Sequence, residues 1–221
     1  MYKRFTLYAI FSYSIIKYYE FFIWYLGQNQ MIIEEALFLA LSCSISMFLF
    51  IIGTHILYFP KIRSHAKVLS YPPLIFLFSM NLGFLISTIN MYSLQIYKIP
   101  TFFDILRSYQ FGILLILIAL LIFYLSIKEF SLIKEDPIPT SSTSFIIKKS
   151  IYGYTRNPMY LAMIILQIGV GMALSMMHIV FFSIFTFIIL KYFVVFPEEF
   201  YLEKKFGREY INYRNKVRRW I

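Results

Sequence analysis

The stretch Ile151-Tyr-Gly-Tyr-Thr-Arg-Asn-Pro-Met-Tyr160 lies between a polar loop and the longest uncharged run of the sequence, residues 158–190. Asn157-Pro158 predicts a helix start, because Asn caps free backbone N–H groups and Pro fits the first helical position. Arg156 precedes this start and has tyrosines around it. If the helix enters a membrane, a guanidinium, aromatic rings and the positive end of a helix meet at the boundary between water and lipid.

The composition predicts an integral membrane protein. Hydrophobic residues make up 60% of the 221 residues and charged residues only 14%, and the mean hydropathy is +0.69. A soluble domain is about one quarter charged. The net charge of +10 comes from lysines and arginines at the ends of apolar runs, which is typical of membrane flanks rather than of nucleic-acid binding. Cys43 lies alone in an apolar run and the three histidines share no ligand spacing, so we expect no disulfide framework and no metal site.

The apolar runs predict an all-α, polytopic transmembrane helix bundle of about six crossings. Lys17 and Glu20 interrupt the first run but, three residues apart, can pair on one helical face. The run 158–190 is too long for one crossing, so we expect a C-terminal helical hairpin with a turn around residues 174–178, where Gly169 and Gly171 let its helices approach closely. The expected crossings are 5–26, 36–58, 72–94, 109–127 and the two halves of this hairpin.

The chain divides at a polar, proline-rich segment that begins near residue 136. We expect N-terminal transmembrane helices in residues 1–135, and a loop, the hairpin and a basic tail in residues 136–221. Apolar residues recur every three or four positions in the tail, 198–221, which predicts an amphipathic helix on a membrane surface or against the bundle. Gly207 within it needs a packing or backbone reason.

The basic residues predict the orientation of the bundle. Six crossings with the N-terminus inside leave only Lys98 and Arg107 on the outer side. The positive-inside rule therefore predicts that both termini are cytoplasmic, in a cell membrane or the endoplasmic reticulum. The inner side would hold Lys3, Arg4, Lys61, Arg63, Lys67, Lys128, Lys134, Lys148, Lys149, Arg156, Lys204, Lys205, Arg208, Arg214, Lys216, Arg218 and Arg219.

A hairpin returns the chain to Arg156 at its own exit, where Glu198 and Glu199 follow Pro197. An arginine, two carboxylates and a helix N-terminus together suit a ligand that carries both charge signs. Pro197 cannot donate to the carbonyl four residues earlier, so we expect a bend and a free carbonyl at Phe193. The structural alternative is that Arg156 only reaches toward the lipid boundary and that the glutamates only pair with nearby lysines.

Gly-Tyr-Thr-Arg-Asn-Pro-Met-Tyr-Leu, a hairpin, Glu198-Glu199 and the spaced tail residues Leu202, Phe206-Gly207, Tyr210, Tyr213, Val217 and Trp220 resemble the isoprenylcysteine carboxyl methyltransferase and phospholipid methyltransferase family. The resemblance covers about residues 145–221. It implies an integral membrane enzyme that uses S-adenosyl-L-methionine to methylate a lipid-like or prenylated acceptor. The cofactor site that it implies comprises Ile146, Ile147, Tyr152, Asn157, Pro158, Met159, Tyr160 and Glu198.

Two kinds of methyl transfer remain open. A carboxylate acceptor is already ionised at neutral pH, and Arg156 would orient it. Where prenylcysteine enzymes carry a substrate-contacting arginine this chain has Val194, so Lys191 is the candidate substrate cation. An amine acceptor must first lose a proton, and Glu199 is then the candidate base. Two further alternatives are an NADPH-dependent sterol-type membrane reductase and a non-catalytic membrane protein of the same fold.

Overall fold

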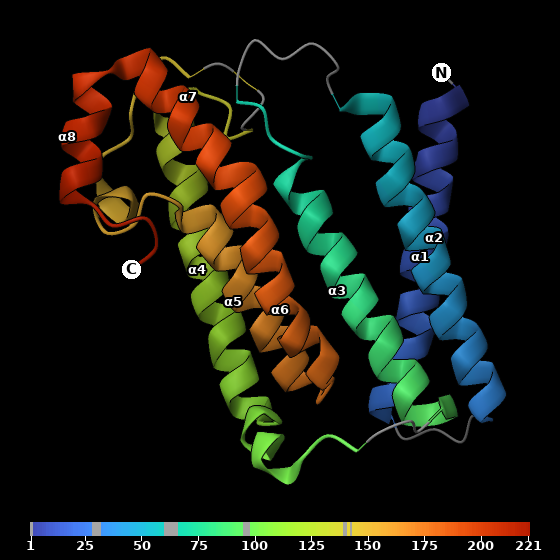
Figure 1. Ribbon diagram of the computed structural model, residues 1–221. Coiled ribbons are helices and arrows are strands. Elements are labelled where there is room, and N and C mark those ends of the chain that lie inside the picture. Colours follow the sequence, from blue (N-terminus) through green and yellow to red (C-terminus); the bar gives the residue numbers. More distant parts are fainter. Residues whose placement is uncertain (1, 28–31, 60–65, 95–97, 139–140, 142) are drawn as a thin grey trace.

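The computed structural model describes the chain except for residues 1, 28–31, 60–65, 95–97, 139–140 and 142, so Lys61 and Arg63 lie outside the described residues. The described residues form helices and no strand, which confirms the predicted all-α class (Figure 1). The α-helices are α1 (Tyr2–Gly27), α2 (Ile33–Tyr58), α3 (Pro72–Ile89), α4 (Tyr109–Leu132), α5 (Pro158–Ala173), α6 (Met177–Leu190), α7 (Phe196–Phe206) and α8 (Arg208–Lys216). Short helical turns span Asn90–Leu94, Thr101–Leu106, Ser150–Gly153 and Lys191–Val195.

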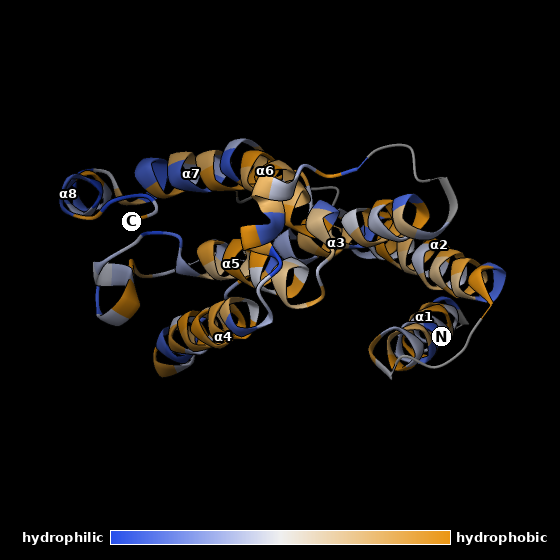
Figure 2. Cartoon of the chain, turned by 90° about the horizontal axis from the view of Figure 1, so that it is seen from below, coloured by the Kyte–Doolittle hydropathy of each residue, from blue (hydrophilic) through white to orange (hydrophobic). Residues whose placement is uncertain are grey.

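The helices form an elongated bundle in which α1 and α2 lie side by side, α3 packs against α6, and α4 packs along α5 (Figure 1). Within the described part of the chain, four helices are long and apolar enough to cross a membrane, namely Ile33–Tyr58, Pro72–Tyr92, Tyr109–Leu132 and Met177–Phe206. The chain is therefore a multi-pass membrane protein. The hairpin helix α5 is apolar but shorter, and α1 carries the expected Lys17–Glu20 pair at 2.7 Å. In Figure 2 hydrophobic residues dominate α4, whereas α8 is largely hydrophilic.

The predicted helical hairpin is present. Helix α5 ends at Ala173 and α6 begins at Met177, and Ser175 between them has a positive φ of 55°. Gly171 lies against Val180 of α6, where a Cβ atom would stand 2.8 Å from the Val180 nitrogen. Gly169 was expected at the same contact but packs against α4 instead, where a Cβ would stand 2.9 Å from the carbonyl oxygen of Gly112. The small residues therefore bring α5 close to two neighbours rather than one.

A buried polar network ties the hairpin to α3. Thr186 of α6 donates to Gln167 of α5 at 2.6 Å, and Gln167 donates to the Ser79 hydroxyl of α3 at 3.2 Å. All three side chains are buried. Because lipid cannot satisfy these groups, their mutual bonds favour one alignment of α3, α5 and α6.

Helices α6 and α7 form one continuous helix of 30 residues from Met177 to Phe206. At a rise of 1.5 Å per residue it is about 45 Å long, whereas the hydrocarbon core is ~30 Å thick. Its end therefore projects beyond the core. Just before Pro197, where we expected a bend, the helix contains the π-helical turn Lys191–Val195. The carbonyl of Phe193, which Pro197 cannot engage, accepts a hydrogen bond from the Leu69 backbone N–H at 2.9 Å.

The basic tail is helical, as expected, but it is not one continuous helix. Gly207 has a φ of 53° and separates α7 from α8, so the reason for this glycine is its backbone conformation. After Lys216 the chain becomes extended, with Val217 at φ −117° and ψ 129°. The amphipathic pattern did not reveal this break, because the apolar spacing continues across it.

Gly112→Ala should destabilise the bundle, because the new Cβ would lie 2.4 Å from the backbone nitrogen of Ala173. Overpacking of this kind costs about 1–3 kcal/mol, so the midpoint of thermal unfolding in detergent should fall by several degrees. Gly153→Ala is the matched control, since its Cβ would meet nothing closer than 3.4 Å. Equal midpoints for the two variants would contradict the close α4–α5 packing.

Candidate active site

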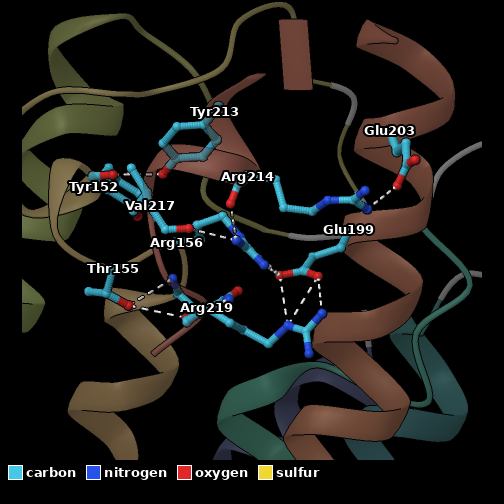
Figure 3. Close-up of polar contacts among 10 residues, drawn as sticks. Tyr152, Thr155, Arg156, Glu199, Glu203, Tyr213, Arg214, Val217 and Arg219 are labelled. Carbon is cyan, nitrogen blue, oxygen red and sulfur yellow. Dashed lines mark hydrogen bonds and ion pairs between the residues drawn. The ribbon is translucent and has the colours of Figure 1, made fainter. Parts of the chain in front are cut away.

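Arg156 and Glu199 form a buried ion pair that joins the entrance of the hairpin to its exit. The Nη2 atom of Arg156 lies 2.8 Å from Oε1 of Glu199, and the two side chains are 7% and 9% exposed. Nε of Arg156 donates to the same oxygen at 3.2 Å. The juxtaposition expected from the sequence is therefore present, and Figure 3 shows it at the centre of a larger network.

A second guanidinium binds the other side of the same carboxylate. Arg219, close to the C-terminus, donates from Nη2 to Oε2 of Glu199 at 2.7 Å and from Nε to Oε1 at 3.0 Å. The Arg219 guanidinium also lies over the ring of Phe196, 4.5 Å from its centroid. Two cations thus share one carboxylate, and the hydrogen bond with Glu199 raises the pKa of Arg219.

Arg156 and Asn157, which precede α5, bind backbone carbonyls of the C-terminal segment. Nη1 of Arg156 donates to the carbonyls of Arg214 at 3.0 Å and Val217 at 2.6 Å. The Arg156 backbone N–H donates to the carbonyl of Arg218 at 3.0 Å. The Asn157 side chain donates to the carbonyl of Arg219 at 3.0 Å and makes no capping bond with α5. The sequence prediction of a side-chain cap at Asn157 was therefore wrong, because this amide binds the C-terminal segment instead of the first turn of α5.

Glu198 faces a different set of groups from its neighbour. The Tyr160 hydroxyl donates to Oε2 of Glu198 at 2.8 Å, and the Tyr160 side chain is buried. Successive residues of a helix point about 100° apart. The glutamate doublet therefore serves two environments: Glu199 faces the arginines and Glu198 faces Tyr160.

Glu198 lines a polar cavity beneath the loop that precedes the motif. The cavity has about 650 Å³ of space between its walls, open mouth included. Ile146, Ile147, Tyr152 and Arg156 also line it, together with Tyr213 from α8. The buried Tyr152 hydroxyl makes no hydrogen bond of ordinary geometry within the described part of the chain. Burial raises the pKa of the Tyr152 and Tyr213 hydroxyls, so both are neutral and able to donate.

An apolar cavity adjoins the polar one. It lies between α3, α4 and α5, and its lining includes Phe123, Ile127, Met159, Tyr160 and Met163. The two cavities share the loop residues Pro137 and Ile138 as a common wall. The hydrogen bond from Tyr160 to Glu198 crosses from one cavity lining to the other.

The structure brings some of the expected site residues together and separates others. Ile146, Ile147, Tyr152, Arg156 and Glu198 share the polar cavity. Met159 and Tyr160 line the apolar cavity, while Asn157, Pro158 and Glu199 line neither. Lys191 also lines neither cavity, and its ammonium group lies 5.1 Å from the centroid of the Tyr192 ring.

The sequence analysis assigned no site role to Arg219 or to Tyr213, although Tyr213 is among the tail residues that carry the family resemblance. Both belong to the periodic basic and aromatic pattern of the tail, in which nothing marks one arginine or one tyrosine. Tyr213 donates its hydroxyl to the carbonyl of Tyr152 at 2.7 Å. These contacts become visible in the structure because the C-terminal segment lies beside the segment before α5, with a β-bridge between Thr155 and Arg218.

Comparisons with known proteins identify the class. Residues 107–209 match the family model described as phospholipid methyltransferase. A protein of Haemophilus influenzae described as uncharacterized is 34% identical over 67 residues, which cover 28% of this chain and 100% of that protein. No solved structure matches the chain significantly. Residues 107–209, just under half of the chain, thus belong to the phospholipid methyltransferase family, and together with the membrane-spanning helices this match indicates a membrane methyltransferase that acts on lipid.

Arg156→Ala should destabilise the protein, because it leaves the Glu199 carboxylate with only the partly exposed Arg219 as its cation. Removing one partner of a buried ion pair costs about 3–5 kcal/mol, so the thermal midpoint in detergent should drop clearly. The exposed Arg208 is the matched control, and Arg208→Ala should leave the midpoint within one or two degrees. A normal midpoint for Arg156→Ala would show that the ion pair contributes little.

Proposed function

We propose that the chain is a methyltransferase that takes its methyl group from S-adenosyl-L-methionine and transfers it to a lipid acceptor at the inner face of the membrane. The observation that carries this proposal is the pair of adjoining cavities, one polar and one apolar, bridged by the Tyr160–Glu198 hydrogen bond. A soluble donor and a lipid acceptor need such a pair of neighbouring sites. The family match supports methyl transfer over the NADPH-dependent reductase and the non-catalytic protein.

The polar cavity has the chemistry that this cofactor requires. S-adenosyl-L-methionine carries a sulfonium, an ammonium, a carboxylate and ribose hydroxyls. Glu198 suits the ammonium or the ribose, and the aromatic face of Tyr152 suits the sulfonium. The buried Tyr152 hydroxyl, which interacts with Ser126 but makes no hydrogen bond of ordinary geometry within the described residues, supplies a donor. Ile146 and Ile147 lie on the same wall. These residues fit the cofactor, and we assign them to its site.

The remaining expected residues take positioning and acceptor-side roles in this proposal. Tyr160 holds the Glu198 carboxylate and contributes its ring to the apolar cavity. Asn157 and Pro158 start α5 and fix the loop around it. Met159 lines the apolar cavity, where a lipid chain would lie. Because α3 and α4 border this cavity, the acceptor can enter from the bilayer while the cofactor arrives from water.

Bound S-adenosyl-L-methionine supplies an electrophilic methyl group on a positive sulfur. The protein's contribution is to align donor and acceptor in line and to exclude water. Glu198 and Tyr152 would hold the cofactor, which would supply the methyl group to the acceptor atom and keep the sulfur as a neutral thioether. A carboxylate acceptor needs no further proton transfer. An amine acceptor must give up one proton, for which a carboxylate near the acceptor is required.

Charge in the cavity favours the amine acceptor. Arg156 is already engaged by Glu199 and by two backbone carbonyls, and Lys191 lies outside both cavities. No other lysine or arginine lines the polar cavity among the described residues. The base role expected of Glu199 is disfavoured by its two guanidinium partners. Glu198, which lines the polar cavity and is bound by Tyr160 of the apolar cavity, is then the candidate base, and Asp136 is a second carboxylate in the lining of the polar cavity.

Incubating membranes that contain the protein with methyl-labelled S-adenosyl-L-methionine tests the function. We expect a labelled lipid that releases no volatile labelled methanol in mild alkali, because an N-methyl group stays bonded to nitrogen whereas a methyl ester is hydrolysed to methanol. An alkali-labile label would establish carboxylate methylation instead. The absence of labelled lipid, together with saturable binding of NADPH by the purified protein, would contradict the proposal and favour the reductase.

Glu198→Ala should weaken binding of S-adenosyl-L-methionine by at least about tenfold, as expected for loss of a charge-assisted contact. Tyr160→Phe should weaken it less, because the carboxylate stays but loses the bond that orients it. Tyr154→Phe is the matched control, since Tyr154 is 80% exposed. Calorimetric titration of the purified variants measures this. Wild-type affinity in both Glu198→Ala and Tyr160→Phe would remove the site assignment.

Ile127→Trp should raise the KM for the lipid acceptor without changing affinity for the cofactor, because the larger ring would fill part of the apolar cavity. Leu121→Trp on the same helix is the control, since Leu121 is 57% exposed and does not line that cavity. Steady-state kinetics with the acceptor identified by labelling makes the comparison. An unchanged KM in Ile127→Trp would place the acceptor elsewhere.

A further inference from the structure

The two adjacent glutamates of α7 have separate partners, and only one of them lines the polar cavity. Glu198 accepts a hydrogen bond from Tyr160 and lines the cavity. The two oxygens of Glu199 are bound by Arg156 and Arg219, as Figure 3 shows. Arg156 comes from the segment before α5, Glu199 from α7 and Arg219 from the C-terminal tail. One carboxylate therefore ties together three parts of the chain that are distant in sequence.

The hydrogen bonds of this cluster hold the end of α8 and the C-terminal segment 217–221, called the tail from here on, by their backbone carbonyls. Arg156 binds the carbonyls of Arg214 and Val217, and its own N–H binds the carbonyl of Arg218. The Thr155 hydroxyl donates to the carbonyl of Arg219 at 3.2 Å. Because these acceptors are backbone groups, the contacts fix where the tail lies. Arg219 is the one tail side chain that reaches Glu199.

The held tail in turn supports the polar cavity. In the sequence, helix α8 connects α7 to the tail. Its Tyr213 lines the cavity and donates a hydrogen bond to the carbonyl of Tyr152 at 2.7 Å. Tyr152 lines the cavity, and its hydroxyl is buried. A displacement of the tail would therefore move Tyr213 and release the backbone of Tyr152.

We propose that Arg156, Glu199 and Arg219 form a clasp that positions the cofactor site through the protein backbone, by holding the tail and α8 so that Tyr213 fixes the position of Tyr152 in the cavity wall. The clasp itself follows from the contacts alone. Its effect on S-adenosyl-L-methionine rests on the function proposed above. In this assignment Glu198 binds the cofactor, and Glu199 is a positioning residue that acts through the tail.

Arg219→Ala in the full-length protein tests the clasp, with Arg218→Ala as the matched control. The two arginines are neighbours, but the Arg218 side chain is exposed and only its backbone carbonyl takes part in the network. Hydrogen–deuterium exchange reports the tail directly. We expect faster exchange at residues 155–157 and 217–219 in Arg219→Ala and wild-type exchange in Arg218→Ala. Equal exchange in the two variants would overturn the clasp.

Binding of S-adenosyl-L-methionine to the same variants tests the positioning role. The Kd should rise about tenfold in Arg219→Ala, comparable to the loss of one preorganising contact, while kcat at saturating cofactor stays within about twofold. Arg219→Lys keeps the cation and should recover part of the affinity. A loosened tail with unchanged Kd would overturn the positioning role, and weakened binding with a wild-type tail would show that Arg219 contacts the ligand.

Tyr213→Phe separates the two halves of the inference, because it removes only the hydroxyl that joins α8 to Tyr152. We expect weaker cofactor binding with normal exchange protection at residues 217–219. Unchanged binding would overturn the link from tail to cavity. If the wild-type protein itself binds no S-adenosyl-L-methionine, the proposed function fails and the cofactor half of this inference falls with it, whereas the exchange measurement still decides the clasp.

Discussion

The carboxylate of Glu199, held between the guanidiniums of Arg156 and Arg219, is the interaction on which the site depends. An ionised carboxylate that is 9% exposed is costly unless cations and hydrogen bonds compensate it. The compensation comes from the segment before the hairpin and from the tail after it. The chain must therefore return to its own motif. The polar cavity forms where it does so, with walls from the loop, the motif, α7 and α8.

The hairpin and the π-helical turn determine where along the bundle the polar cavity forms. Close packing at Gly171 and Gly112, and the buried Ser79–Gln167–Thr186 bonds, align α3 to α6 within the apolar part of the bundle. The last turns of the long helix then project past the hydrocarbon layer. A polar cavity and an apolar cavity adjoin near this end of the bundle, as the proposed transfer from a water-soluble methyl donor to a lipid acceptor would require.

The helical hairpin and the proximity of Arg156 to the two glutamates could be predicted from the sequence, because apolar runs and proline positions are local features of the chain. The family resemblance was also correct. The break at Gly207 was hidden because the amphipathic spacing continues through it. The role of Asn157, the packing of Gly169 against α4 and the contacts of Arg219 depend on which distant backbone lies nearby, and periodicity carries no such information. The boundary near residue 136 and the inward orientation of both termini stay predictions.

Photo-cross-linking of methyl-labelled S-adenosyl-L-methionine to the purified protein, followed by identification of the labelled peptides, tests the central claim most directly. The account predicts saturable labelling within residues 145–160 or 198–213, abolished by excess unlabelled cofactor. Labelling confined to the N-terminal helices α1 to α3, or labelling that excess cofactor does not reduce, would contradict it.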